Sequence, residues 1–267
     1  MPNTTNDEGP SRDYYTREEL DELGIEYPEP PERACRHCGR ALETKAFIAL
    51  KSVIWIADEE CGCEESERAK VEERRIQAAR EAHEKRKRYL SCGIERRFLT
   101  ATVSNAECAE YIAGFEQSGG KGLFITGCVG AGKTYLASAI ARHLIDAGKS
   151  VRMATSADML AAIQSTFDNE SSSLDAIHAF GGASLLVIDD LGKESASDWS
   201  LSTLFQIVNM RYGAMLPTIV TSQYPFSKLI ERFARRGDED TAVAIVSRLK
   251  ETCTLIKLED RNRRLEK

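Results

Sequence analysis

Short apolar runs alternate with longer segments of helical periodicity from about residue 91 to the end of the 267-residue chain. The short runs are typical of buried parallel strands, whereas apolar residues at every third or fourth position are typical of amphipathic helices. Strands are expected at 122–126, 151–155, 185–190, 217–223 and 254–258, helices at 105–116, 134–147, 156–167, 174–180, 199–212, 226–234 and 241–249, and loops at 168–173 and 235–240. Strands that alternate with helices predict an α/β domain over residues 91–267, with a parallel sheet flanked by helices.

The first 90 residues follow other patterns. Residues 1–33 are polar and proline-bearing, with ten acidic and three basic side chains, and we expect mostly a disordered acidic tail. A short helix is expected after Thr16, because Thr16 and Glu19 have the spacing of a capping box. Residues 64–90 contain nine Lys or Arg, seven Glu and no Gly or Pro, which predicts a charged helical linker.

Four cysteines lie between the tail and the linker, in a C-x-x-C pair and a C-x-C pair. They are Cys35, Cys38, Cys61 and Cys63. Four thiolates in two close pairs suit a tetrahedral, structural Zn²⁺ site, and a metal would stabilise a segment too short to build its own core. Residues 34–63 are therefore predicted to form a zinc-binding module, with short strands at 47–50 and 53–56. His37 is a weaker alternative ligand, and free or redox-active thiols are the alternative to a metal site.

The segment between the 122–126 strand and the helix after it matches the phosphate-binding pattern G-x-x-x-x-G-K-[ST] at every fixed position. Its residues are Gly127, Cys128, Val129, Gly130, Ala131, Gly132, Lys133 and Thr134, followed by Tyr135 in the helix. Glycines let backbone N–H groups point at a phosphate chain, and a helix N-terminus favours anions. Lys133 is expected to contact the β- and γ-phosphates, and the Thr134 hydroxyl to ligate Mg²⁺. A glycine-rich turn without a ligand is the alternative, which the flanking strand and helix disfavour.

Two aspartates, Asp189 and Asp190, end an apolar strand about 55 residues after the phosphate loop. Ligands bind at the carboxyl ends of the strands in open parallel sheets, so these carboxylates are expected beside the phosphates. Asp189 is predicted to hold Mg²⁺ directly or through water, and Asp190 to orient or deprotonate the attacking water. The two motifs together predict a site for a nucleoside triphosphate and Mg²⁺.

Charge and composition limit the classes of protein that remain. The net charge is −6, and because residues 1–33 carry most of the acidic excess, the remaining chain is close to neutral. This balance argues against a protein that coats DNA nonspecifically, although it leaves room for a local basic surface. No apolar run approaches the length of about eighteen residues that a membrane helix needs, and the first thirty residues lack a signal peptide's apolar segment. We expect a cytoplasmic protein without a membrane partner.

The order of four motifs resembles that of the AAA+ ATPases of the DnaC/IstB group. The motifs are Gly127–Thr134, Leu185–Asp190, Pro217–Gln223 and Ser247–Leu249, and the similarity is most specific at Asp189–Glu194 and Asn209–Tyr212. It covers residues 91 to 264 approximately. The resemblance implies a P-loop NTPase sheet of the AAA+ (ASCE) type that binds ATP, preceded here by a small zinc-ribbon-like module. The helical lid of larger AAA+ proteins is expected to be absent or vestigial, because only 19 residues follow Arg248.

The same resemblance implies roles for single residues. Gly127–Thr134 corresponds to Walker A and Leu185–Asp190 to Walker B, which ends Asp-Asp where many relatives of the wider class have Asp-Glu. Sensor 1 falls on Gln223, where the family usually has Asn. Arg248 falls where the family places an arginine finger, which acts on the γ-phosphate bound by a neighbouring subunit. The resemblance thus implies a homo-oligomer with composite ATP sites, and a surface arginine without this role is the alternative. A phosphate-sensing role for Arg261, Arg263 or Arg264 is open.

The function that this resemblance implies is ATP-dependent loading of the replicative hexameric helicase onto single-stranded DNA in replication initiation. ATP hydrolysis is expected to be slow and to depend on assembly or DNA, and the zinc module is expected to dock a partner. An IstB-like ATPase helper of transposition is the first alternative. An adaptor that uses ATP as a switch without hydrolysis is the second, left open by Gln223 and the Asp-Asp ending. A small-molecule kinase is disfavoured by the Asp189–Asp190 strand and by Arg248.

Overall fold

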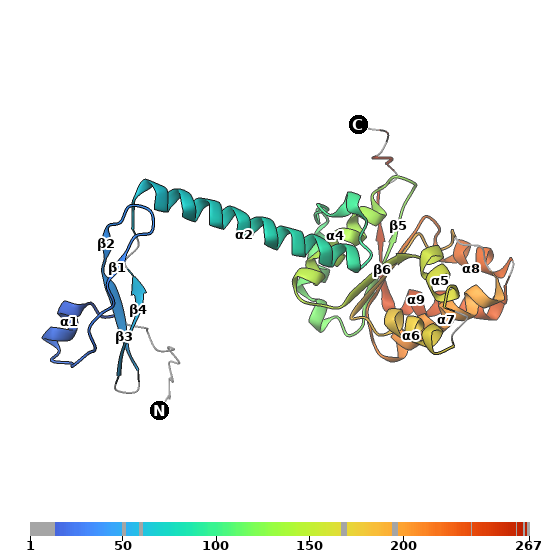
Figure 1. Cartoon of the computed structure of the whole chain (residues 1–267). Coiled ribbons are helices and arrows are strands. Elements are labelled where there is room, and N and C mark those ends of the chain that lie inside the picture. The colour runs from blue at the N-terminus through green and yellow to red at the C-terminus, as the bar shows by residue number, and fades with distance from the viewer. Residues whose placement is uncertain are drawn as a thin grey trace, which may run out of the picture. The chain divides into compact units, whose positions relative to one another are not determined.

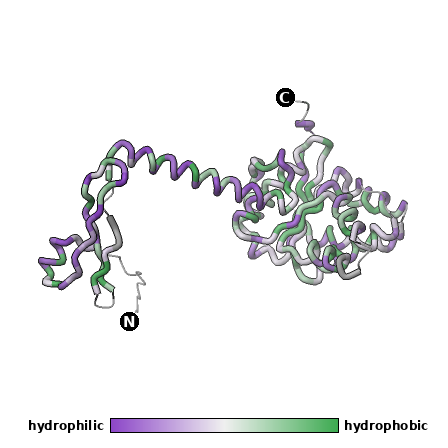
Figure 2. The backbone as a smooth tube through the Cα atoms, in the orientation of Figure 1, coloured by the Kyte–Doolittle hydropathy of each residue, from purple (hydrophilic) through white to green (hydrophobic). Residues whose placement is uncertain are grey.

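The computed structural model describes residues 14–49, 52–58, 61–166, 170–193, 197–235, 237–259, 261–263 and 265. The chain divides into two compact units, Met1–Ala82 and His83–Lys267. The division falls within one long helix, α2 (Glu64–Ser91), which covers the segment predicted as a helical linker (Figure 1). Figure 2 shows mostly hydrophilic residues along α2, where even Val71 and Ile76 are exposed. Of the helices in the described ranges, none has the length and apolar character needed to cross a bilayer.

The N-terminal unit consists of a short helix and two antiparallel strand pairs. Its elements before α2 are α1 (Arg17–Glu22), β1 (Arg33–Ala34), β2 (Ala41–Leu42), β3 (Thr44–Ala49) and β4 (Ser52–Asp58). β1 pairs with β2, and β3 pairs with β4 in the region where two short strands were predicted. The capping box between Thr16 and Glu19 is present at the start of α1, as the sequence predicts.

Residues 14–33 differ from the disordered tail expected for 1–33, of which residues 1–13 lie outside the described residues. Leu20 of α1 is buried with Ala46 of β3 and Val53 of β4 in a small apolar cluster. Tyr15 pairs with Ala46 through two backbone hydrogen bonds of 2.8 and 2.9 Å. The β3–β4 hairpin has too few apolar residues to bury one of its faces alone, so the preceding segment supplies the apolar side chains that cover it.

The C-terminal unit contains one parallel sheet of five strands. The strands are β5 (Gly122–Thr126), β6 (Val151–Thr155), β7 (Leu185–Asp189), β8 (Thr218–Ser222) and β9 (Cys253–Lys257). Their order across the sheet is β6-β7-β8-β5-β9, and every neighbouring pair is parallel. This confirms the predicted α/β fold with a parallel sheet. It also places β5, which leads into the phosphate loop, between β8 and β9.

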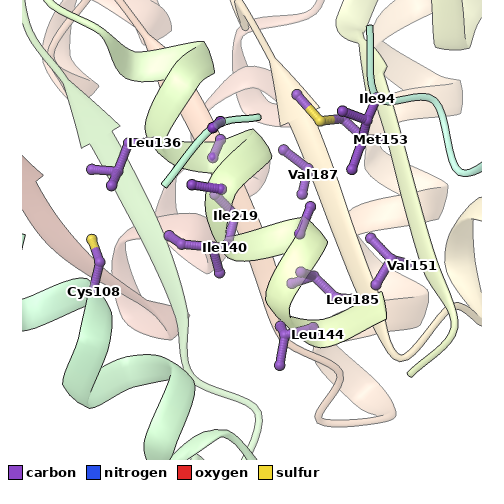
Figure 3. Packing of buried hydrophobic residues seen from close by; sticks show 14 of the residues in the cluster. Ile94, Cys108, Leu136, Ile140, Leu144, Val151, Met153, Leu185, Val187 and Ile219 are labelled. Atoms are coloured by element: carbon purple, nitrogen blue, oxygen red, sulfur yellow. The ribbon is translucent and has the colours of Figure 1, made fainter. Parts of the chain in front are cut away.

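Helices cover both faces of this sheet (Figure 1). They are η1 (Arg96–Phe98), α3 (Ala106–Ala113), η2 (Phe115–Gln117), α4 (Lys133–Asp146), α5 (Ser156–Gln164), α6 (Glu170–Gly181), α7 (Asp198–Gly213), α8 (Phe226–Ala234) and α9 (Glu239–Thr252). Along β7, Leu185 and Val187 join the core beneath α4, while Leu186 and Ile188 join the core beneath α5, α7, α8 and α9. Figure 3 shows Leu136, Ile140 and Leu144 of α4 in the first of these cores.

The structure differs from the predicted elements mainly in the segment before β7. A loop was expected at 168–173, but α6 already begins at Glu170 and continues to Gly181. The hydroxyl groups of Thr166 and Ser173 lie 3.0 Å apart, and Ser173 also donates to the carbonyl oxygen of Thr166, so side-chain hydrogen bonds hold the start of this helix. At the other end of the domain, the described residues 258, 259, 261–263 and 265 contain no helix.

Candidate functional site: a nucleotide site and a cysteine cluster

The phosphate loop joins the end of β5 to the first turn of α4. Gly132 precedes the helix with a φ of 99°, a conformation that glycine adopts without strain, and α4 begins at Lys133. The Lys133 ammonium donates to the carbonyl oxygens of Gly127 and Cys128 at 3.0 and 2.9 Å. Burial lowers the pKa of Lys133, while the charge of Asp190 acts in the opposite direction. A cation therefore lies within the loop, next to a helix N-terminus that favours anions.

Asp189, the last residue of β7, is buried beneath the phosphate loop and accepts two hydroxyl hydrogen bonds. Thr134 donates to Asp189 Oδ2 at 3.0 Å, and Thr221 of β8 donates to Asp189 Oδ1 at 2.6 Å. Burial raises the pKa of Asp189, and the two hydrogen bonds partly offset this shift. A hydroxyl and a carboxylate that lie this close are the kind of oxygen ligands that Mg²⁺ prefers, so the pair fits the predicted metal.

Asp190 follows β7 in an unusual backbone conformation, with a φ of 55°. Its N–H donates to the hydroxyl oxygen of Thr221 at 2.9 Å. Its carboxylate forms an ion pair with Lys193, with 2.7 Å between Oδ2 and Nζ. The turn after β7 thus directs one aspartate, Asp189, into the sheet edge and the next, Asp190, toward the phosphate loop.

A cavity of about 670 Å³ lies over the phosphate loop. Its walls include Arg97, Phe98, Thr102, Ser104, Val129, Gly130, Gly132, Lys133, Thr134, Tyr135, Asp190, Lys193 and Arg263. Four cationic side chains but a single carboxylate line it, which suits a polyanion. The aromatic rings of Phe98 and Tyr135 pack edge to face with centroids 6.5 Å apart, and both lie on the cavity wall. The cavity has the size typical of ligand pockets, and its walls combine charge for phosphates with rings that suit a base.

Most of the predicted site residues meet at this cavity. Val129, Gly130, Gly132, Lys133, Thr134, Tyr135 and Asp190 line it, and Gly127, Cys128 and Ala131 complete the loop. Gln223, the predicted sensor residue, directly follows β8 at the same edge of the sheet but does not line this cavity. Arg248 lies on α9, where its Nε donates to Asn209 Oδ1 at 3.1 Å and its guanidinium packs against the rings of Phe205 and Tyr212. It does not line the cavity of its own chain either.

Three residues outside the predicted set also contact this site. Thr221 touches both aspartates, although no motif marks it. Arg97 reaches the cavity from η1. Arg263, whose phosphate-sensing role was left open, lines the cavity, and its backbone N–H donates to the carbonyl oxygen of Gly130 at 3.1 Å. Polar residues at the end of the predicted 217–223 strand and the basic residues near the C-terminus were the signals that pointed to two of these.

The four predicted zinc-binding cysteines also meet. The sulfur atoms of Cys35, Cys38, Cys61 and Cys63 all lie within 4.8 Å of one another. Two of their separations are 3.8 Å and 3.5 Å, close to the edge of about 3.8 Å that a tetrahedron with Zn–S bonds of about 2.3 Å requires. Backbone N–H groups of Cys38 and His37 lower the pKa of Cys35 to about 6, whereas the pKa values of Cys61 and Cys63 are raised, so without a metal the thiolate form is favoured at Cys35. The His37 side chain is exposed and does not belong to the cluster.

The phosphate loop lies between β5 and α4, and the paired acids lie at the end of β7, which is separated from β5 by one strand, β8. Together they define a P-loop ATP-binding protein of the AAA+ class. The family model described as IstB-like ATP binding protein matches residues 99–267. The chain therefore belongs to this family, and its fold and motifs agree with the DnaC/IstB resemblance found in the sequence.

Named relatives support the same grouping over part of the chain. The replicative helicase loader DnaC of Escherichia coli K12 is 32% identical over 114 residues, which cover 42% of this chain and 46% of that protein. The replicative helicase loader DnaI of Bacillus subtilis is 24% identical over 161 residues, or 58% of this chain and 51% of that protein. The chain thus spans about half the length of these relatives.

Solved structures show the same fold. The crystal structure of the DnaC helicase loader aligns with a TM-score of 0.52 and 24% identity, over 62% of this chain and all of that one. The crystal structure of DnaI aligns with a TM-score of 0.53 and 25% identity, over 62% and 95% of the two chains.

Proposed function

We propose that this protein is an ATPase that loads a replicative hexameric DNA helicase onto single-stranded DNA. The similarity to relatives named DnaC and DnaI, together with an intact nucleotide cavity, is the observation that carries the proposal. The ATPase domain is the part that resembles those relatives. The partner and the DNA are therefore proposed for the whole protein from this similarity.

The cavity residues divide the chemistry between binding and activation. Lys133 binds the phosphates, and the Thr134 hydroxyl and the Asp189 carboxylate hold Mg²⁺, which when bound neutralises phosphate charge. Asp190 lines the cavity and orients the attacking water or accepts its proton. Its Oδ2 also pairs with Lys193, and a carboxylate has further lone pairs with which to accept a hydrogen bond from water.

Arg248 acts on a neighbouring subunit in this proposal. It lies outside the cavity of its own chain, on a helix surface where Asn209, Phe205 and Tyr212 fix its direction. An arginine held in this way has little conformational freedom to lose when it binds a phosphate. ATP sites would then be completed only in an oligomer.

The cysteine cluster is proposed as a structural zinc site. The geometry of its four sulfur atoms fits Zn²⁺, and all four protein positions are filled by thiols, which is typical of a site without a free position for catalysis. The N-terminal unit around it is proposed to dock the helicase or another partner. This separates partner binding from the nucleotide cavity.

Transposition is the second candidate function, because the matched family is described as IstB-like. A transposition helper would use the same nucleotide cavity, so the ATP site does not discriminate between the two candidates. The two candidates differ in the partner protein, which is a helicase in one case and a transposase in the other. An adaptor that uses ATP only as a switch would differ from both in lacking hydrolysis.

Co-purification with the hexameric replicative helicase of the same organism, with and without ATP, tests the proposal. Wild-type protein should retain the helicase and change its retention when ATP is added. Lys133→Ala should lose the ATP response, because Lys133 lies in the phosphate loop. Lys121→Ala is the matched control, since Lys121 donates to the Glu251 carbonyl at the opposite end of β5. Capture of a transposase but no helicase would favour the second candidate, and capture of neither would overturn the loading function.

A further inference from the structure

One buried hydroxyl group connects both aspartates of the site. Thr221 lies in β8 next to β7 and is 0% exposed. Its Oγ1 donates to Asp189 Oδ1 at 2.6 Å and accepts the N–H of Asp190 at 2.9 Å. A hydroxyl has one hydrogen to donate and lone pairs to accept with, so a single threonine can serve both partners at once.

The same stretch of β8 also holds the turn that follows β7. The N–H of Leu191 donates to the Thr221 carbonyl oxygen at 2.9 Å, and the Ser222 hydroxyl donates to the Leu191 carbonyl oxygen at 2.7 Å. Between these contacts Asp190 has a φ of 55°, a conformation that residues other than glycine adopt infrequently. The hydrogen bond from Asp190 N–H to Thr221 is therefore well placed to keep this conformation, which directs the Asp190 carboxylate toward the cavity.

We propose that Thr221 is a positioning residue of the nucleotide site, whose hydroxyl fixes Asp189 for Mg²⁺ and Asp190 for the attacking water. The proposal rests on the proposed ATP and Mg²⁺ binding of this cavity. Thr221 itself does not line the cavity, so it acts through the two aspartates and contacts neither nucleotide nor water. Its role differs from that expected of Gln223, the residue on which the resemblance places sensor 1.

Two substitutions separate the hydroxyl from the packing of the side chain. Thr221→Val keeps the shape of threonine and removes the hydroxyl, whereas Thr221→Ser keeps the hydroxyl and removes the methyl group. The measurements are kcat and KM for ATP, the Mg²⁺ concentration that half-saturates binding of a fluorescent ADP analogue, and the affinity for that analogue in EDTA. Thermal unfolding of each variant shows whether the fold is kept.

Thr221→Val should lower kcat by about tenfold or more with little change in KM, because a hydrogen bond to a charged group is lost. It should also raise the half-saturating Mg²⁺ concentration by about tenfold, while the affinity in EDTA stays within about twofold of wild type. Thr221→Ser should remain close to wild type in kcat, in KM, in its Mg²⁺ dependence and in its affinity in EDTA. A merely structural role would affect the affinity in EDTA as much as the affinity with Mg²⁺.

Wild-type kcat and Mg²⁺ dependence in Thr221→Val would overturn the proposal, as would equal losses in the Val and Ser variants. If Thr221→Val does not fold, Thr221→Ala removes the same hydroxyl and replaces it in the comparisons with wild type and with Thr221→Ser. A wild-type protein that binds no nucleotide with or without Mg²⁺ would refute the ATP site itself. The Mg²⁺ measurement tests Thr221 even if the protein binds ATP without hydrolysing it.

Discussion

The Thr134 hydroxyl donates to Asp189 Oδ2 at 3.0 Å and so joins the first turn of α4 to the end of β7. Walker A and Walker B, separated by 55 residues, are thus in direct contact. Their contact lies where both motifs predict Mg²⁺. The hydrogen bond holds together the two side chains that would hold Mg²⁺ in the proposed site.

Loss of the Thr134 hydroxyl should therefore weaken nucleotide binding only when Mg²⁺ is present. Thr134→Ala should lower the affinity for Mg²⁺–ATP by about tenfold, with little effect in EDTA, because a metal ligand is lost while the loop N–H groups remain. Thr134→Ser is the control and should bind as wild type, since serine offers the same oxygen. Titration of a fluorescent ATP analogue measures both affinities. Equal binding by the Ala and Ser variants with Mg²⁺ would show that Thr134 is not a ligand.

The sequence was sufficient for features whose residues lie close together along the chain. The phosphate loop is one continuous segment, and its glycines and lysine can be recognised by spacing alone. The cysteine cluster could be predicted for the same reason, because its thiols come in two close pairs. The length and composition of the short apolar segments predicted the strands of the sheet.

Features that depend on how distant segments align with one another could not be predicted from the sequence. Thr221 faces Asp189 because β8 lies beside β7, an order that periodicity does not reveal. Leu20 is buried only because residues 14–33 fold back onto β3 and β4. The composition of this segment is polar and acidic, so the sequence alone predicted a disordered tail. Arg263 reaches the cavity because residues after β9 return to the phosphate loop. Each of these contacts joins elements that are far apart in the sequence.

Arg248 provides a prediction about assembly. Arg248→Ala should reduce ATP hydrolysis by about a hundredfold or more under conditions in which the protein assembles, because an arginine that stabilises transferred-phosphate charge is lost. The affinity of the monomer for ATP should be unchanged, since Arg248 does not line its own cavity.

Arg235→Ala is the matched control, because Arg235 is an exposed arginine at the end of α8. Mixing experiments sharpen the test: Arg248→Ala and Lys133→Ala subunits are each inactive alone but should recover part of the activity when mixed. Normal hydrolysis by assembled Arg248→Ala would refute the proposed finger.

The cysteine cluster leads to a prediction about metal content. Purified protein should contain about one zinc per chain, because four thiolates complete a tetrahedral site. Removal of the metal by a strong chelator should unfold the N-terminal unit, and far-UV circular dichroism should report a loss of structure, while ATP affinity is kept. Cys61→Ser should lose the metal, and Cys92→Ser, which changes a thiol outside the cluster, should retain it. Four freely titratable thiols at these positions in metal-free, folded protein would contradict the site.

Arg211 of α7 donates hydrogen bonds to several buried acceptors at the end of the strands opposite the nucleotide site. It is 1% exposed, and its Nη1 donates to the carbonyl oxygens of Phe180, Gly181 and Ala183 at 3.2, 3.1 and 2.7 Å. Its other nitrogens donate to the Pro217 carbonyl and to the Thr218 hydroxyl, where β8 begins. Although burial lowers the pKa of Arg211 to about 10, the guanidinium keeps its charge at neutral pH. One side chain thus satisfies acceptors in the turns before β7 and β8.

Arg211→Met keeps much of the side-chain volume but removes the guanidinium donors from these buried acceptors. Each unsatisfied buried group costs about 1–3 kcal/mol, so the variant should lose about 3 kcal/mol or more of unfolding free energy. Arg211→Lys should recover little of it, because an ammonium lacks the planar fork that reaches several carbonyls together. Urea unfolding measures the loss, with Arg235→Ala as an exposed control that should stay within about 0.5 kcal/mol of wild type. ATP affinity of the folded variant should be unchanged, and a Met variant as stable as wild type would show that these acceptors do not depend on Arg211.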